Sequence, residues 1–292
     1  MEREPVAYAM TTFRLASRTV HRVGFGAMQL PGPGVFGPPR DHDEAVRVLR
    51  RAVELGVDHV DTAQYYGPMV ANELIWEALH PYPENLALVS KVGGKRSETG
   101  EWLLVDDPAE LRADIEANLR TLGVDRLTAV NLRLWDGEEV GDRFDRQLDV
   151  MIAARDDGLI DGIGLSNIGR EHLLHALERT DIACVQNPYN LVDRSSQPVL
   201  DECAARGIAF VPFFPLGSGF AQDNPVLGNP VVRGAARELG RTPAQIVLAW
   251  TLGVAPNVLL IPGTSSVAHL EENLAVDGID LGEALRAELD AI

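Results

Sequence analysis

Asp61, Tyr66 and Lys91 lie at or near the ends of two apolar runs, 57–61 and 86–92, and could together carry acid–base chemistry. A lysine in a buried strand must pair with an anion or lose its charge, and Asp61 is an available partner. A nearby ammonium would lower the phenol pKa from about 10, so that Tyr66 could exchange a proton near neutral pH. A buried Asp61–Lys91 ion pair beside a passive tyrosine is an equally open interpretation.

Further polar and aromatic side chains follow at the ends of later apolar runs. Ser166, Asn167 and Gln186 carry hydroxyl and amide groups that suit a flat carboxamide, and Phe213 and Phe214 offer a ring for stacking. Arg133 ends another apolar run. Trp102 and Trp135 are candidate pocket walls, although ordinary aromatic packing explains them as well.

The small residues at 262–266 lead into a predicted helix at 267–275. Free backbone N–H groups and the dipole at such a helix N-terminus favour an anion such as a phosphate, and a plain Ser/Thr cap is the alternative. A proton donor, a carboxamide cradle, an aromatic face and a phosphate loop together indicate nicotinamide-dependent carbonyl reduction.

Alternating strands and helices must position these residues. Strands are predicted at 24–28, 57–61, 86–92, 127–134, 162–167, 183–187, 209–214 and 258–261. Helices are predicted at 43–55, 72–79, 108–122, 143–157, 170–179, 197–206, 231–239, 243–252, 267–275 and 281–289. Eight strand–helix units predict an α/β fold, a (β/α)8 TIM barrel, with its site at the carboxyl ends of the strands.

A short N-terminal hairpin at 13–23 and an extra C-terminal helix complete this prediction. Residues 12–292 are expected to form one domain, and 1–11 a flexible tail. A doubly wound open sheet is the alternative. It would need a glycine-rich dinucleotide turn, and the segment 24–26 lacks the third glycine.

The composition excludes several classes of partner. The 292 residues are 46% hydrophobic and 24% charged, with a net charge of −17, which disfavours nucleic acid. No run reaches the roughly 18 apolar residues of a membrane helix, and no signal peptide is recognisable. Cys184 and Cys203 give no disulfide framework and are predicted to be core thiols. A cytoplasmic protein of unspecified oligomeric state is expected.

Three motifs resemble those of the aldo-keto reductases. They are GVDHVDTA at 56–63 with Tyr66 and Gly67, GLIDGIGLSN at 158–167 within a longer match from 148, and IPGT at 261–264 with HLEEN at 269–273. The resemblance runs from about residue 12 to the C-terminus. It implies a barrel that reduces a small carbonyl substrate with NADP(H), with Tyr66 as general acid and Asp61 and Lys91 tuning it.

The resemblance also implies a cofactor site. Its expected residues are Gly26, Met28, Asp61, Ser166, Asn167, Gln186, Phe213, Phe214, Leu216, Gly217, Gly263, Thr264, Ser265, Ser266, His269, Glu272 and Asn273. No metal is expected.

Two positions depart from the family pattern. Arg133 stands where the family usually has a catalytic histidine, and it cannot act as a neutral imidazole because it stays charged. It could polarise a carbonyl, steady tyrosinate or pair with an anionic group, or it could be a structural ion-pair residue. Gly263 and His269 replace the usual Lys and Arg beside the adenosine phosphate, which weakens the preference for NADPH over NADH.

Four further runs resemble the bacterial pyridoxal reductases (pyridoxine 4-dehydrogenases) within this family. They are GAMQL at 26–30, GPGVFGPPR at 32–40, VNLR at 130–133 and VPFFPLG at 211–217. This group shares the arginine at position 133. The resemblance implies reduction of pyridoxal to pyridoxine, with Arg133 facing the substrate phenolate.

Other functions stay open. A metal-dependent hydrolase would need His and carboxylate ligands at strand ends, but the histidines fall mostly on predicted helices or loops. A glycosidase could pair Asp61 with Asp136 but would leave Lys91 unexplained. Within the family, a reductase of another aldehyde or of a sugar or secondary-metabolite ketone is possible, as is a cofactor-binding regulatory barrel with little turnover.

Overall fold

The computed structural model describes residues 11–217 and 224–292. Its main sheet is parallel, in the order β11-β10-β9-β8-β5-β4-β3. These strands are β3 (Phe25–Gly26), β4 (His59–Asp61), β5 (Ala87–Val92), β8 (Leu127–Arg133), β9 (Ile160–Ser166), β10 (Cys184–Pro188) and β11 (Ala209–Phe213). Almost all their residues are buried, as expected for parallel strands that are covered on both faces.

The segment 257–260 joins the two edges of this sheet. Val258 bridges to Phe210 of β11, and Leu260 bridges to Val23 just before β3. The backbone hydrogen bonds at this joint are Phe210 N to Asn257 O (2.9 Å), Leu259 N to Phe210 O (2.9 Å), Leu260 N to Arg22 O (2.7 Å) and Gly24 N to Leu260 O (2.8 Å). The predicted eighth strand therefore exists as two isolated bridges, which close the predicted (β/α)8 barrel.

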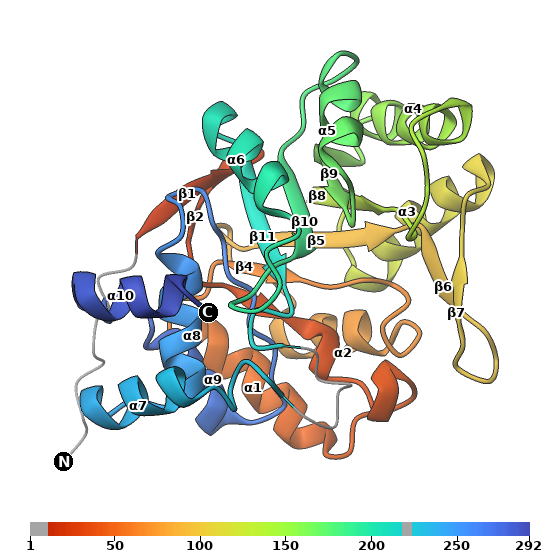
Figure 1. Cartoon of the computed structure of the whole chain (residues 1–292). Helices are drawn as coiled ribbons and strands as arrows, with labels where there is room; N and C mark the ends of the chain where they lie inside the picture. Colours follow the sequence, from red (N-terminus) through yellow and green to blue (C-terminus); the bar gives the residue numbers. More distant parts are fainter. Residues whose placement is uncertain (1–10, 218–223) are drawn as a thin grey trace.

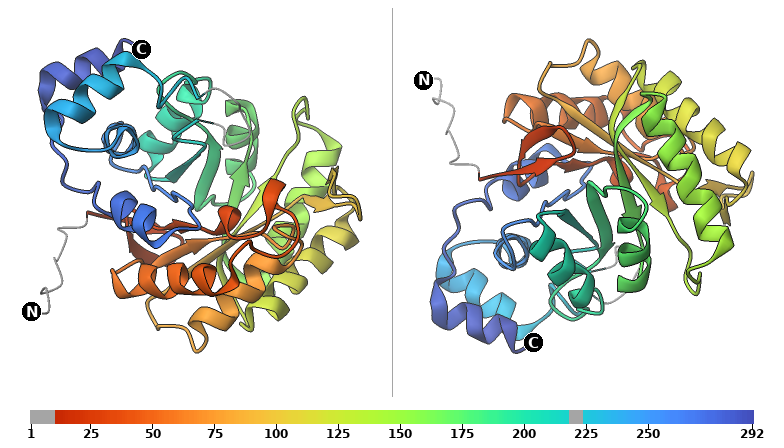
Figure 2. Two further views of the ribbon diagram at one scale, coloured as in Figure 1. Left: turned by 90° about the horizontal axis from the view of Figure 1, so that it is seen from below. Right: turned by 90° about the horizontal axis from the view of Figure 1, so that it is seen from above.

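Helices surround the strands, as Figures 1 and 2 show from three directions. They are α1 (His42–Glu54), α2 (Val70–Leu79), α3 (Pro108–Leu122), α4 (Asp142–Asp156), α5 (Arg170–Leu177), α6 (Gln197–Arg206), α7 (Pro230–Leu239), α8 (Pro243–Leu252), α9 (Val267–Leu274) and α10 (Gly282–Asp290). Every predicted helix is present, and its ends shift by at most two residues.

Local sequence explains why these boundaries were predictable, and α3 is an example. The Asp107 carboxylate accepts hydrogen bonds from the N–H groups of Ala109 and Glu110, and Pro108 occupies the first turn. Gly123 ends the helix with a φ of 64°, a left-handed conformation that favours glycine.

The predicted N-terminal hairpin is confirmed as β1 (Thr12–Leu15) and β2 (Arg18–His21). Leu15 and Val20 are buried against a cluster that includes Ala87, Cys184 and Ala209, the first residues of β5, β10 and β11. The hairpin therefore covers the end of the barrel opposite the carboxyl ends of the strands, and leaves that other end open for a site.

A second hairpin, β6 (Gly94–Arg96) and β7 (Trp102–Leu104), replaces the loop expected after β5. Neither the sequence of β6, Gly-Lys-Arg, nor that of β7, Trp-Leu-Leu, has the alternation that predicts strands. The Arg96 guanidinium donates to the carbonyls of Val35 (2.9 Å) and Gly100 (2.6 Å), and its Cζ lies 3.9 Å from the Trp102 ring centroid. Arg96 thus fixes this hairpin to the segment that follows β3.

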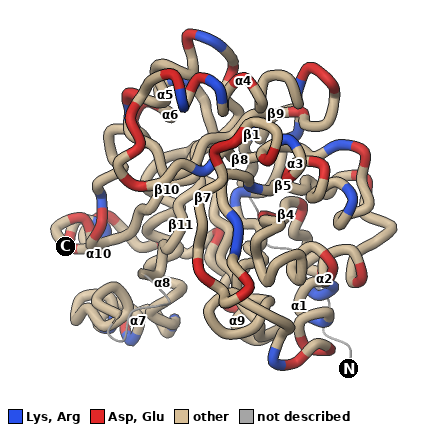
Figure 3. Tube along the Cα trace, turned by 90° about the vertical axis from the view of Figure 1, so that its right-hand side faces the viewer, with Lys and Arg blue, Asp and Glu red and all other residues tan. Residues whose placement is uncertain are grey.

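Acidic positions are spread over several outer helices and loops (Figure 3). Both cysteines are buried, as predicted, and burial raises the pKa of the Cys184 thiol to about 12. Within 11–217 and 224–292, no helix combines the length and apolar character needed to cross a bilayer. The flexible tail predicted at 1–11 lies, apart from Thr11, outside the described residues.

Candidate active site

A cavity of about 560 Å³ opens at the carboxyl ends of the strands, where the barrel fold predicts a site. It gathers side chains from all around the barrel. The predicted site residues that line it are Gly26, Met28, Asp61, Tyr66, Lys91, Arg133, Gln186, Phe213, Phe214, Leu216, Gly217 and Gly263.

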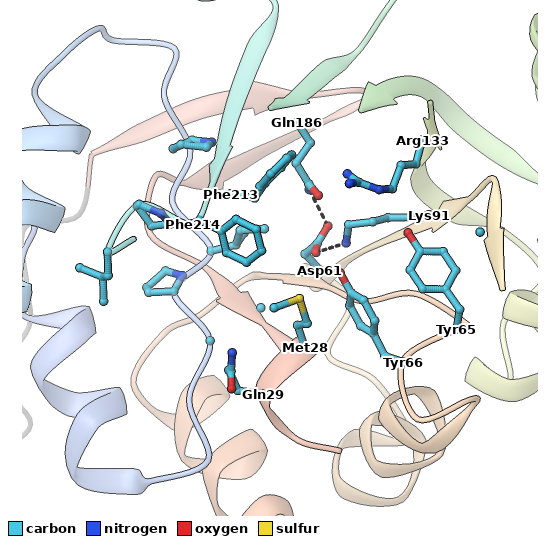
Figure 4. Close-up of a pocket in the computed structure, with 18 of the residues that line it drawn as sticks. Met28, Gln29, Asp61, Tyr65, Tyr66, Lys91, Arg133, Gln186, Phe213 and Phe214 are labelled. Carbon is cyan, nitrogen blue, oxygen red and sulfur yellow. Dashed lines mark hydrogen bonds and ion pairs between the residues drawn. The ribbon is translucent and has the colours of Figure 1, made fainter. Parts of the chain in front are cut away.

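Asp61 and Lys91 form a buried ion pair at the base of this cavity (Figure 4). Lys91 Nζ donates to Asp61 Oδ1 and also to the backbone carbonyl of Thr62 at 3.0 Å. The side-chain amide of Gln186 donates to Asp61 Oδ2 at 2.9 Å. Asp61 is therefore held on both oxygens, and Gln186, which we expected to hold a carboxamide, already binds this carboxylate.

Tyr66 lies beside the pair, with Lys91 Nζ 5.0 Å from its ring centroid. Burial raises the pKa of the Tyr66 phenol above its usual value near 10, the Asp61 carboxylate adds to the rise, and Arg133 opposes it. The expected net lowering of this pKa is wrong, because the burial of the phenol outweighs the nearby positive charges. Tyr66 therefore holds its proton at neutral pH.

Arg133 extends from the end of β8 into the cavity (Figure 4). Its Nη1 lies 3.4 Å from Ser166 Oγ, and its guanidinium carbon lies 5.3 Å from the Phe213 ring centroid. Among the described residues, no carboxylate comes within ion-pair distance of it. The structural ion-pair role considered for Arg133 is therefore not seen, and its charge is available to an anionic ligand.

Four cavity residues add aromatic and amide surface. Trp102 and Trp135 line the cavity, and Trp135 Nε1 donates to the Gly93 carbonyl at 2.9 Å. Tyr65 and Gln29 also line it, although their sequence positions did not predict a place in the site. The turn beyond β4 brings the neighbouring residues Tyr65 and Tyr66 to the same cavity, a geometry that residue types alone do not indicate.

Ser166 and Asn167 were expected to contact a carboxamide, but neither lines the cavity. Ser166 is fully buried beneath Arg133. The Asn167 amide donates to the Leu134 carbonyl (3.1 Å) and to Asp136 (2.8 Å). Of the three residues predicted for this cradle, the structure therefore brings only Gln186 to the cavity.

The rest of the predicted phosphate site lies on α9 and the turn before it, outside the cavity lining. Its residues are Thr264, Ser265, Ser266, His269, Glu272 and Asn273. Thr264 Oγ1 accepts from the Ser266 N–H at 3.1 Å within the turn, but the N-cap residue Ser266 makes no side-chain cap bond, so the plain cap interpretation is not confirmed. The next N–H, that of Val267, donates at 3.1 Å to the carboxylate of Glu44, which also pairs with Arg47 at 2.6 Å. An anion of the chain itself thus occupies this helix N-terminus.

Gly26 and Gly263 pack backbone to backbone at the rim of the cavity. A Cβ at Gly26 would meet the carbonyl oxygen of Ile261, and one at Gly263 would meet that of Gly26. This close approach gives a physical reason for glycine at position 263, where the family usually has lysine.

The similarity of this chain to known proteins agrees with the geometry of the site. The model of the aldo/keto reductase family matches residues 22–292. Pyridoxine 4-dehydrogenase of Escherichia coli is 47% identical over 284 residues, which cover 96% of this chain and 98% of that protein. An uncharacterized oxidoreductase of Schizosaccharomyces pombe is 36% identical, with coverage of 96% and 89%.

Among solved structures, an aldo/keto reductase from Klebsiella pneumoniae in complex with NADP and acetate is similar. It is 26% identical, with a TM-score of 0.79 and coverage of 97% of this chain and 95% of that one. The barrel, the order of the motifs and the matched length agree with the resemblance found in the sequence. The chain belongs to the aldo/keto reductase family.

Proposed function

We propose that this protein is an NADPH-dependent aldehyde reductase that converts pyridoxal to pyridoxine. The observation that carries the proposal is the buried Asp61–Lys91 pair beside Tyr66, at the base of a cavity that is also lined by Arg133. Pyridoxine 4-dehydrogenase of E. coli, at 47% identity, supports the substrate, and the NADP complex of the K. pneumoniae enzyme supports the cofactor.

The residues of the cavity fit a nicotinamide cofactor. Phe213 offers an aromatic face for the flat ring, and Met28 adds apolar surface. The backbones of Gly26 and Gly263 are bare at the rim, where a side chain would fill the space. When bound, the cofactor supplies the hydride that reduces the carbonyl carbon.

The chain supplies the proton and the charge stabilisation. Tyr66 is protonated at neutral pH, as a phenol with a pKa of 10 or above must be, and it donates this proton to the carbonyl oxygen as negative charge develops there. Lys91, held by Asp61, keeps a positive charge near the phenol and stabilises the resulting tyrosinate. Gln186 fixes Asp61 so that this charge stays in place.

Arg133 selects the substrate in this proposal. Pyridoxal carries a phenol that ionises readily next to its aldehyde, and Arg133 is a cation in the cavity with no carboxylate partner among the described residues. A phenolate that binds this guanidinium would orient the aldehyde towards Tyr66. The two buried thiols are compatible with a reducing cytoplasm as the site of action.

The test is NADPH oxidation by the purified protein, followed at the nicotinamide absorbance, with pyridoxal and benzaldehyde in parallel. We expect pyridoxal to turn over, and Tyr66→Phe to lose at least about 10²-fold in kcat while it still binds NADPH. Turnover of benzaldehyde alone would retain the reductase and reject the substrate. Undiminished turnover in Tyr66→Phe would reject the mechanism.

A further inference from the structure

Five buried polar side chains lie behind the loop that carries Tyr66, outside the cavity. They come from the loop itself, from α2, from β5 and from α3, and they are Thr62, Gln64, Asn72, Ser90 and Asn118. Each is at most 3% exposed, so water cannot replace its partners. None of these five side chains has a chemical role in the proposed reaction.

Asn118 is the centre of this cluster. Its Oδ1 accepts hydrogen bonds from Ser90 Oγ (2.6 Å) and Asn72 Nδ2 (3.0 Å). Its Nδ2 donates to Gln64 Oε1 (3.0 Å) and to the Asp114 carbonyl (2.9 Å). Two acceptor and two donor positions are the full capacity of an amide, so the side chain is fixed in one orientation.

The partners of Asn118 adjoin the proposed catalytic residues in sequence. Gln64 lies in the loop that leads from Asp61 to Tyr66, and the Tyr66 N–H donates to the Ala63 carbonyl at 3.0 Å within the same turn. Ser90 immediately precedes Lys91 on β5. One buried amide on α3 therefore links the loop of the phenol to the strand of the ammonium.

Asn72 makes a second connection to the same loop. Its Oδ1 accepts from Thr62 Oγ1 at 2.8 Å, and the backbone carbonyl of Thr62 accepts from Lys91 Nζ at 3.0 Å. The loop is thus held by Lys91 on the cavity side and by the two asparagines behind it. A buried network in which every member is bonded holds one geometry, because any displacement leaves a polar atom without a partner.

We propose that Asn118 is a positioning residue that sets the place of the Tyr66 hydroxyl relative to Lys91 and the substrate carbonyl. This inference rests on the proposed reductase function. Proton transfer needs heavy atoms within about 3 Å, and a displacement of about 1 Å can reduce the rate about 10²-fold. Asn118 touches neither substrate nor cofactor and acts through the loop and the strand that it joins.

The test removes each link separately. Gln64→Met deletes the link to the loop with little change in volume, and Ser90→Ala deletes the link to the strand, while Asn118 stays in both. We expect each variant to lose about 10-fold in kcat for aldehyde reduction. Their dissociation constants for NADPH, measured by fluorescence, should stay within about twofold, because the cavity lining is unchanged. With deuterated NADPH, each variant should show a larger kinetic isotope effect on kcat than the wild type, because the chemical step becomes slower and limits the rate more fully.

Because both links act through Asn118, the double variant Gln64→Met/Ser90→Ala should lose much less than the product of the two single losses. The control is Asn257→Ala, which removes a buried amide from the opposite end of the barrel, where it donates to the Ile208 carbonyl at 2.8 Å. It should lower the melting temperature and leave kcat unchanged.

Folded single variants with wild-type kcat would overturn the positioning role and leave the reductase proposal intact. The positioning role is also overturned if the control loses as much kcat, or if the single losses multiply in the double variant. A wild-type protein that reduces no aldehyde would overturn the proposed function and this inference with it.

Discussion

Gln186 donates its side-chain amide to the oxygen of Asp61 that Lys91 does not bind, at 2.9 Å. This bond completes the contacts of a buried carboxylate. Gln186→Leu leaves that oxygen without its donor, and we expect a loss of about 2 kcal/mol in the free energy of unfolding. Urea denaturation measures it.

The control for this prediction is a buried amide with a neutral partner. Asn257→Leu removes a donor to the Ile208 carbonyl and should lose about 1 kcal/mol, less than Gln186→Leu, because bonds to charged groups are stronger. If both variants are equally stable, the bond to Asp61 contributes nothing beyond a neutral one.

Replacing Arg133 by Leu should separate substrate recognition from catalysis. The variant loses the cation that would bind the pyridoxal phenolate, so its kcat/KM for pyridoxal should fall about 10²-fold, as for a lost charged hydrogen bond. For benzaldehyde, which has no phenol, the change should stay within about threefold. Steady-state kinetics on both aldehydes provides the comparison, and equal losses on both would place Arg133 in the general chemistry.

Glu44 should influence the choice between NADPH and NADH. Its carboxylate occupies the N-terminus of α9, where the family resemblance puts the adenosine phosphate. A negative group there repels the adenosine phosphate that NADPH carries and NADH lacks. Glu44→Gln should therefore tighten NADPH binding about threefold and leave NADH binding unchanged. Fluorescence titration with each cofactor measures the ratio. Equal changes for both would show that the phosphate binds elsewhere.

Asp114, on α3 beside Gln64, should make stability depend on pH. Burial raises the pKa of Asp114 from 3.8 to about 6, Glu110 adds to the rise, and Lys95 opposes it. The folded state therefore holds this proton more tightly than the unfolded state, and its contribution to stability falls as the pH rises from about 4 to about 6. Above pH 6 the charged, half-buried carboxylate remains a cost.

Asp114→Asn removes that cost. After allowance for solvent screening, we expect the variant to gain about 1 kcal/mol over the wild type at pH 8 and almost nothing at pH 4. Denaturant unfolding at both pH values measures the difference. A gain of the same size at both would point to a cause other than ionisation.

Features encoded in local sequence were predicted well. Helix α3 is capped by Asp107 and Gly123, and each predicted helix lies within two residues of the observed one. Buried parallel strands were visible as apolar runs, and the polar residues that end them, such as Asp61 and Lys91, meet in one cavity because parallel strands share their carboxyl ends.

Features that depend on tertiary contacts were not predicted. The hairpin β6–β7 is fixed by Arg96, whose partner Val35 is distant in sequence. The raised pKa of Tyr66 depends on how deeply the phenol is buried and on how close the Asp61 carboxylate lies. The anion at the N-terminus of α9 comes from Glu44 on α1, and no pattern near residue 267 could indicate it.

The joint at 257–260 has a consequence for the dynamics of the whole barrel. It holds two isolated bridges, whereas β8 and β9 pair over six residues, so the ring should open there first. The amide protons of Gly24 and Leu260 should then exchange with solvent earlier than those of β8. A cofactor that lies against Gly26 and Gly263 touches both sides of the joint, and its binding would slow this exchange by holding the ring shut.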